Sequence, residues 1–138
     1  MLKILFKLVI CSVFLLKACE LEDNDNELDW EGNEISFDED FKTLHTLDSG
    51  PILFKKKSEK PFFGRIKKDL KDSHKLQAFS GGKLHGKSIT QKKDGSRVEA
   101  SFKHGILHGE MKFYDSTNHL RASIHYIDGK LQPNRIKK

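Results

Sequence analysis

Apolar and polar side chains alternate along much of the second half of the chain. In one run the apolar positions are Val98, Ala100 and Phe102, with polar residues between them. The same alternation is present over residues 107–113 and 122–126, and turn-forming residues separate the runs. A period of two is typical of a strand with one buried face, and a turn between two such strands makes a hairpin. The pattern therefore predicts a series of antiparallel β-hairpins with one apolar face.

One sequence motif of eight residues occurs three times in this part of the chain. It covers residues 79–86, returns 23 residues later at 102–109, and returns after 24 more residues at 126–133. A fixed period in the low twenties indicates a small supersecondary unit that stacks on copies of itself. Because such a unit buries its apolar face only against its neighbours, the repeat predicts the fold, and the function must be argued from other features.

The glycines of the repeat fall at two kinds of position. Gly105 and Gly129 lie in predicted hairpin turns, where glycine takes a positive φ without a steric cost. Gly64, Gly86 and Gly109 lie inside strand patterns, where a glycine often marks a bulge or a close approach of two backbones. The residues that we expect to define the repeated structure are Gly64, Phe79, Gly82, Leu84, Gly86, Gly95, Phe102, Gly105, Leu107, Gly109, Phe113, Tyr126 and Gly129.

The first copy of the motif is the least regular. Phe79 is one place out of step with Phe102, which predicts a bulge near Phe79. A weaker hairpin is predicted around residues 52–70, in which residues 62–64 stand where residues 84–86 stand in the next unit.

These residues resemble the MORN repeats, in the variant found in many small bacterial proteins. The matching residues are Asp94-Gly95, Phe102, Gly105, Leu107-His108-Gly109 and Phe113-Tyr114-Asp115. Residues 60–64 are similar to the opening that often precedes such repeats, and the resemblance extends over residues 50–132. It implies a mainly β, single-layer stack of hairpins that serves as a scaffold or an interaction surface, without catalytic residues. Some relatives are described as antitoxin components, which implies that they neutralise a partner protein inside the cell.

The first 18 residues have the pattern of a signal peptide. Lys3 and Lys7 give the N-terminus a positive charge, and Leu8 to Leu16 is an apolar run of nine residues. This run matches a signal-peptide core and is well short of the ~20 residues that span a bilayer. We therefore expect residues 1–18 to be removed from the mature protein.

The end of this segment, at Leu16, Ala18 and Cys19, resembles a bacterial lipobox, although Lys17 departs from the usual pattern. The resemblance implies cleavage between Ala18 and Cys19, a diacylglyceryl thioether on Cys19, and an acyl group such as palmitate on its new amino group. A secretory signal with an incidental cysteine is the alternative. Acyl chains contribute ~0.8 kcal/mol per buried methylene, so two or three of them hold a soluble domain at a membrane. We expect a lipid-anchored protein of the cell envelope, at the outer membrane, its periplasmic face or the cell surface.

Charge divides the remaining chain into two parts. Residues 20–48 contain twelve Asp and Glu and one Lys, whereas residues 49–138 contain 21 Lys and Arg and eight Asp and Glu. We expect residues 19–48 to be an acidic, largely disordered tether, with a short helix over 37–47 or an extended segment packed on the domain edge. Residues 49–138 then form the repeat domain. We also expect residues 28–48 to cap the hairpin stack and keep the protein monomeric, because unpaired strand edges invite self-association.

Lysines are clustered in the basic part of the chain and form a candidate surface for an anionic ligand. Anionic lipid, a sulfated or phosphorylated glycan, or an acidic protein face fits this charge, whereas nucleic acid is not the expected partner of an exported protein. The alternatives are a solvated lysine face and a fold-back of the acidic tether onto the basic sheet. The candidate lysines are Lys55, Lys56, Lys57, Lys67, Lys68, Lys71, Lys75, Lys92 and Lys93.

The chain has no pattern typical of a catalytic or metal-binding site. Its seven histidines lack the spacing of a zinc site, and His85 and His108 occupy the same position of the repeat. Asp94 and Asp115 are among the aspartates at predicted turns, where a carboxylate accepts local main-chain hydrogen bonds. We therefore predict no enzyme, no metal and no cofactor, and expect a binding or scaffold protein. The alternatives are an antitoxin or immunity protein that neutralises a partner, and an envelope hydrolase, which would need a converging acid and base.

Overall fold

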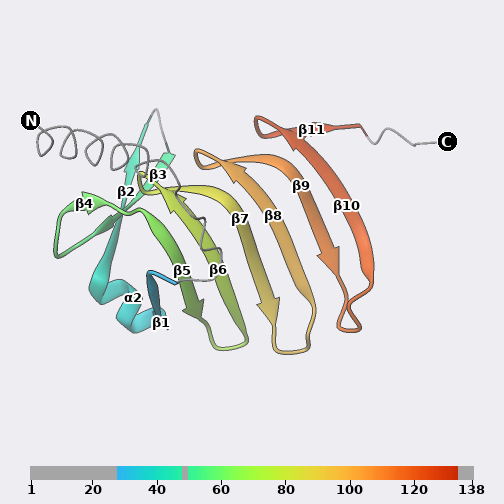
Figure 1. Cartoon of the computed structure of the whole chain (residues 1–138), viewed down its shortest axis with the longest axis horizontal. Coiled ribbons are helices and arrows are strands. Elements are labelled where there is room, and N and C mark those ends of the chain that lie inside the picture. The colour runs from blue at the N-terminus through green and yellow to red at the C-terminus, as the bar shows by residue number, and fades with distance from the viewer. Residues whose placement is uncertain (1–27, 48–49, 134–138) are drawn as a thin grey trace, which may run out of the picture.

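The chain folds into mainly β structure with one short helix, as the alternation of its side chains predicted. The computed structural model describes residues 28–47 and 50–133. The expected signal peptide, Cys19 and residues 20–27 of the expected tether lie outside the described residues. Two open sheets are formed, one of eight strands and one of three (Figure 1).

The eight-stranded sheet is built from consecutive antiparallel hairpins, with a parallel strand added at its first edge. In Figure 1, strands β5–β11 form a curved sheet that passes from green to red, and β1 is drawn in blue. The order across the sheet is β1-β5-β6-β7-β8-β9-β10-β11. The bounds of these strands are β1 (Trp30–Asn33), β5 (Gly64–Asp69), β6 (Ser73–Ser80), β7 (Lys83–Lys92), β8 (Arg97–Lys103), β9 (Ile106–Tyr114), β10 (Leu120–Ile127) and β11 (Lys130–Gln132).

Each copy of the repeated motif makes the same cross-strand pairing in this sheet. In three strand pairs a glycine lies opposite an aromatic residue: Gly64 and Phe79, Gly86 and Phe102, and Gly109 and Tyr126. In each case the following turn glycine donates its N–H to the residue two places before the facing glycine. These bonds join Gly82 to Phe62 O (2.7 Å), Gly105 to Leu84 O (2.7 Å) and Gly129 to Leu107 O (2.8 Å). Gly105 and Gly129 have φ of 86° and 76°, as predicted for turn positions.

The bulge predicted near Phe79 is present, because the register between β6 and β7 shifts between Gln77 and Phe79. A shift at the same place of the next unit lies between Ala100 and Phe102. Phe79 and Phe102 are therefore equivalent, and the irregularity belongs to both units. The expectation that it would distinguish the first copy is wrong.

The three-stranded sheet contains β2 (Phe41–Thr46), β3 (Gly50–Lys55) and β4 (Lys60–Pro61), in that order. The hairpin predicted around residues 52–70 is wrong as a single unit, because β3 pairs with β4 in the small sheet while β5 joins the large one. Gly64 nevertheless occupies the position in its own unit that Gly86 occupies in the next unit, as predicted.

The helix α2 (Glu34–Asp40) begins and ends earlier than the helix predicted over residues 37–47. The Asn33 side chain accepts the Ser36 N–H at 3.0 Å, and the Ser36 hydroxyl accepts the Asn33 N–H at 3.0 Å, so the helix begins here. Its last turn contains no basic residue, so no cation within the helix itself compensates the negative end of the helix dipole. Phe41 then takes an extended conformation and starts β2. The extended alternative is thus the correct one for the rest of this segment.

The division of the chain between residues 48 and 49 is also wrong as a domain boundary. Strand β2 pairs with β3 along its whole length, so this division falls inside a hairpin. Residues 28–47 belong to the folded domain and are not a disordered tether. They do cap the first end of the hairpin stack, as we expected, because β1 pairs with β5 at the edge of the large sheet.

The hydrophobic core lies where the helix and the small sheet cover the large sheet. Its buried residues, each at most 5% exposed, are Phe41, Leu53, Phe62 and Ile66. Three partly buried aromatic residues pack against them: Trp30, Phe37 and Phe79. The ring centroids of neighbouring aromatic residues in this group lie 4.9 to 5.9 Å apart, in edge-to-face and stacked pairs.

The two faces of the large sheet differ. We call the face that carries Ile66 the inner face and the opposite one the outer face. Across the strands, one row of the inner face consists of Ile66, Gln77, Ser88, Ala100, Met111 and Ile124. We call α2, β1 and β2–β7 the covered end, and β8–β11 the single-layer region. Within the described residues, the helix and small sheet lie over β5–β7, and no second layer covers the inner face of the single-layer region (Figure 1).

Candidate functional site

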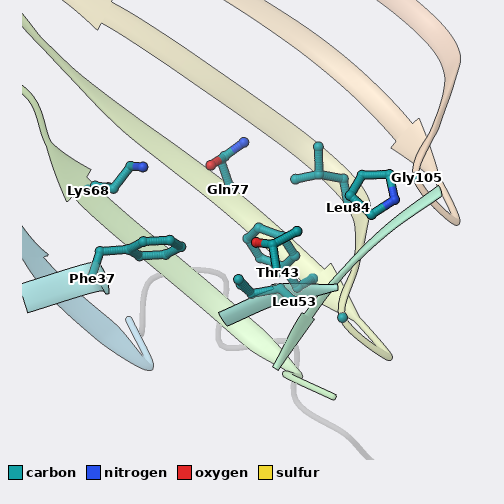
Figure 2. Close-up of a pocket in the computed structure, with 10 residues that line it drawn as sticks. Phe37, Thr43, Leu53, Lys68, Gln77, Leu84 and Gly105 are labelled. Atoms are coloured by element: carbon teal, nitrogen blue, oxygen red, sulfur yellow. The ribbon is translucent and has the colours of Figure 1, made fainter. Parts of the chain in front are cut away.

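A cavity of about 250 Å³ lies between the helix and small sheet on one side and the inner face of β5–β7 on the other. We call it the groove. In Figure 2, Lys68 and Phe37 lie at one end and Leu84 and Gly105 at the other. The groove is lined by Phe37, Thr43, Pro51, Leu53, Lys68, Gln77, Phe79, Gly82, Leu84 and Gly105.

The walls of the groove are mainly apolar because they continue the hydrophobic core. Phe37 from α2, Leu53 from β3 and Phe79 from β6 belong to both. The Leu53 N–H donates to Gly82 O at 2.8 Å, which holds β3 across the turn between β6 and β7. A Cβ on Gly82 would lie 2.5 Å from Leu53 O, and Gly82 has a φ of 74°. Glycine is therefore required here for close approach as well as for the turn.

Two polar side chains, Lys68 and Gln77, lie in the groove on neighbouring strands. The Lys68 Nζ is 4.4 Å from the centroid of the Phe37 ring, which is a cation–π contact. Lys75 lies directly across from Lys68 on β6. No ion pair formed between described residues includes Lys68 or Lys75. This end of the groove therefore carries positive charge that no described carboxylate compensates by direct contact.

The candidate lysines lie in four places rather than on one surface. Lys68 and Lys75 lie at the groove, and Lys67 lies on the outer face, where it pairs with Glu31. A third group lies at one end of the hairpins, because the Lys93 N–H donates to Asp72 O at 3.0 Å and brings two turns together. This group contains Lys71, Lys92 and Lys93, and the fourth group, at the end of β3 and in the turn to β4, contains Lys55, Lys56 and Lys57.

Lys56 has a structural partner that sequence reasoning did not find. Its N–H donates to Asp40 O at 2.8 Å, and its ammonium donates to Asp38 O. These carbonyls belong to the last turn of α2, where a cation is favourable. Lys56 therefore compensates for the missing basic residue within the helix.

The histidines of the repeat have a main-chain role. Nδ1 of His85 accepts the N–H of His104 at 3.5 Å, and Nδ1 of His108 accepts the N–H of Asp128 at 3.4 Å. The donors are equivalent turn residues with φ of 51° and 49°. Each histidine thus contacts the turn of the following hairpin. Within residues 28–47 and 50–133, no three His, Cys, Asp or Glu side chains are placed to hold a metal ion.

The outer face of the single-layer region is internally paired. Glu99 contacts Arg97 at 2.8 Å and Lys87 at 3.1 Å, and the Arg97 guanidinium lies 3.7 Å from the centroid of the Tyr114 ring. Burial alone would raise the pKa of Glu99, but hydrogen bonds from Arg97 and Lys87 lower it below its usual value. Glu99 thus compensates part of the positive charge of Arg97 and Lys87 by direct contact, whereas Lys68 in the groove has no such partner among the described residues.

Asp115 anchors the turn between β9 and β10. Its Oδ1 accepts the N–H of His119 and the N–H and hydroxyl of Thr117, each at 2.8 to 2.9 Å, and its Oδ2 accepts from Arg121 at 2.6 Å. These bonds, led by the His119 N–H, hold the pKa of Asp115 well below its usual range. Asp94 likewise accepts the N–H and hydroxyl of Ser96, which lowers its pKa. The local hydrogen bonds predicted for these two turn aspartates are confirmed.

Sequence reasoning placed only some of the groove residues at a site. Lys68 was a candidate for anion binding, and Phe79, Gly82 and Leu84 were assigned to the repeat alone. Gln77 was missed because the alternation points the other way: Leu76 and Ala78 are the apolar residues of this strand, and Gln77 lies between them. The register of β5 and β6 nevertheless places Gln77 opposite Ile66 on the inner face, and no sequence pattern signals this. Thr43 was missed because its segment was assigned to the tether, as a short helix or an extended segment, and not to a site.

No protein-family model matches the chain, no curated protein matches its sequence, and no solved structure matches it. The resemblance to MORN repeats therefore stays a prediction from the sequence. In the described part of the chain, no helix has the length and apolar composition needed to cross a membrane.

Proposed function

We propose that this protein is a lipid-anchored binding or scaffold module of the cell envelope, with MORN-like repeats whose inner face is the contact surface. The observation that carries the proposal is the uncovered inner face of the single-layer region. Strands β8–β11 present a broad sheet surface that no described element covers.

The inner face is better suited to a partner than the outer face is. It carries half-buried apolar side chains, which a partner would remove from water on binding: Val98, Phe102, Leu107, Met111, Phe113, Ile124 and Tyr126. On the outer face, Glu99 pairs with Lys87 and Arg97, and Glu110 pairs with Lys112. Burial of apolar area is the main driving force of protein association, so the inner face offers the larger gain.

The proposed anchor is Cys19. The lipobox-like residues before it and the acidic segment after it fit a protein held at a membrane surface. To test this, the wild type and Cys19→Ser would be labelled with a clickable fatty acid and fractionated. We expect a labelled, membrane-bound wild type and an unlabelled variant released from the membrane. An unlabelled, cytosolic wild type would contradict the envelope location and favour the antitoxin alternative.

The contact surface is tested by photo-crosslinking in living cells. A benzophenone amino acid would replace Met111 on the inner face or, as the matched control, Lys112 next to it on the outer face. We expect the probe at position 111 to crosslink to a discrete partner and the probe at 112 to give little product. Equal crosslinking from the two faces would contradict the inner face as the contact surface.

A further inference from the structure

The described sheets have four edge strands, and β2 differs from the other three. Strands β1, β11 and β4 have four, three and two residues. β4 ends in Pro61 and β11 is followed by Pro133. Short edges and proline prevent the addition of another strand. β2 has six residues and contains no proline, and among the described strands it pairs with β3 alone.

The main-chain groups of β2 that face away from β3 can be identified from β3 itself. The Leu53 N–H donates to Gly82 O at 2.8 Å, and Leu53 O accepts the Phe62 N–H at 2.9 Å. Both groups of Leu53 therefore point away from β2. In an antiparallel pair of strands, two residues that face each other behave alike. If the N–H and C=O of one point away from the other strand, those of its partner do so too. The cross-strand partner of Leu53 is Thr43, so the Thr43 N–H and C=O point to the open edge.

The same alternation continues along β2. His45 lies two residues beyond Thr43 and opposite Pro51, which has no N–H to donate, so its main-chain groups also point to the open edge. At Phe41 the outward N–H is already used, because it donates to Phe37 O and closes the helix. Among the described residues, the main chain of Thr43 and His45 makes no hydrogen bond outside the β2–β3 ladder. The N–H and C=O groups of Thr43 and His45 thus have the spacing needed to pair with another strand.

This open edge lies at the groove, since Thr43 is one of the lining residues. A strand beside β2 would place alternate side chains toward the inner face of the large sheet. There it would meet Phe79 and Leu84, which are apolar, and Lys68 at the end near Phe37 (Figure 2). None of the described residues that line the groove is an aspartate or a glutamate. The complementary segment therefore carries apolar side chains and an acidic one.

We propose that the groove binds an extended, acidic segment of a partner protein, which adds to β2 as a fourth strand of the small sheet. The segment pairs with the main chain of Thr43 and His45, covers Phe79 and Leu84 with an apolar side chain, and directs a carboxylate to Lys68 and Lys75. This inference rests on the proposed binding function, to which it adds a kind of partner and a second place of contact, the groove at the covered end. Main-chain bonds supply affinity in this mode, and the side-chain contacts supply specificity.

The test uses three synthetic octapeptides in which valine and threonine alternate and one position is glutamate, glutamine or lysine. Binding to the protein is measured by fluorescence anisotropy at low salt, and amide exchange by NMR. We expect the glutamate peptide to bind about tenfold more tightly than the lysine peptide, because a carboxylate reaches a lysine ammonium. We also expect the amides of Thr43 and His45 to exchange at least about tenfold more slowly in the complex, because each forms a hydrogen bond.

Two variations separate strand addition from contact through side chains. N-methylation of the glutamate peptide at the residues that face β2 removes main-chain donors and keeps every side chain, and we expect about tenfold weaker binding. Lys68→Gln should weaken the glutamate peptide several-fold, whereas Lys92→Gln, which lies outside the groove, should leave it unchanged. Thr43→Pro should also reduce binding, and its melting temperature shows whether the variant is folded.

Three results overturn the inference: no binding by any of the peptides, equal binding of the N-methylated peptide, or unchanged exchange at Thr43 and His45 in the complex. Crosslinking at Met111 distinguishes this failure from failure of the proposed function. A partner crosslinked at Met111 together with any of the three results leaves the binding function in place and removes strand addition to β2. Equal crosslinking from Met111 and Lys112, with no peptide bound, contradicts both.

Discussion

The covered end and the single-layer region share one repeated backbone and differ in what packs against it. The turn glycines Gly82 and Gly105 make the same hydrogen bond to the preceding unit, at 2.7 Å in both cases. A Cβ on Gly82 would lie 2.5 Å from Leu53 O, whereas a Cβ on Gly105 would find its nearest neighbour at 3.8 Å. The repeat therefore sets the local structure, and the elements outside it decide how tightly each unit is packed.

The same contrast holds for the hydrophobic side chains. Ile66 is 1% exposed because the small sheet covers it, whereas Met111 and Ile124, in the same row of the inner face, are only half-buried. Since hydrophobic stabilisation follows the apolar area removed from water, the covered end contributes more stability per residue. We expect the single-layer region to open more readily, and this is also where a partner would add the missing layer.

The largest expected loss of stability comes from removing an aromatic side chain of the core. Phe41→Ala removes a side chain that is 3% exposed and should lower the free energy of unfolding by about 3–5 kcal/mol. Phe113→Ala in the single-layer region should cost about 1–2 kcal/mol, because this side chain is only partly buried. Urea unfolding of the two variants measures the difference. Equal losses would mean that the small sheet adds no special stability.

A smaller effect is expected from the two turn glycines. Gly105→Ala should cost about 1–2 kcal/mol, because alanine is strained at a φ of 86°. Gly82→Ala has the same backbone strain and also forces β3 away from the turn, so its loss should be larger by at least about 1 kcal/mol. Thermal unfolding of both variants tests this order. If Gly105→Ala is the more harmful change, the close contact with β3 does not stabilise the fold.

The smallest effect is a pH dependence within the single-layer region. The folded pKa of Asp115 lies below its usual value of 3.8, so its ionised form stabilises the fold above that pH and this contribution is lost as the pH falls below it. Asp115→Asn should therefore lower the melting temperature at pH 7, and the difference from the wild type should shrink below about pH 4. A difference that stays constant from pH 7 to pH 2 would contradict a role for the charge.

Much of the large sheet could be predicted because its determinants are local. Alternation places Val98, Ala100 and Phe102 on one face, and glycine turns such as Gly105 need a conformation that other residues rarely adopt. The groove could not be predicted in the same way. It requires Leu53 to lie against Gly82, far along the chain, and this contact has no periodic signal.

The helix limits were missed for a related reason. Phe37, Phe41 and Leu44 are spaced as on one helical face, and this favoured a helix over residues 37–47. In the structure Phe37 and Phe41 do meet, with ring centroids 4.9 Å apart, although one lies in a helix and the other in a strand. The spacing correctly predicted that the two residues lie together in the core. The backbone conformation that it predicted for them, one continuous helix, was wrong.

By itself the sequence determined that this protein is mainly β, that its hairpins repeat, and where its turns lie, because period, glycine and turn chemistry act over a few residues. Only the tertiary structure decided that residues 28–47 belong to the fold and that Lys68, Gln77 and the edge of β2 share a groove. It also decided that described elements cover one end of the sheet and leave the other end open. These features depend on contacts between distant segments, whose free energy comes from buried area and from main-chain bonds that no local pattern records.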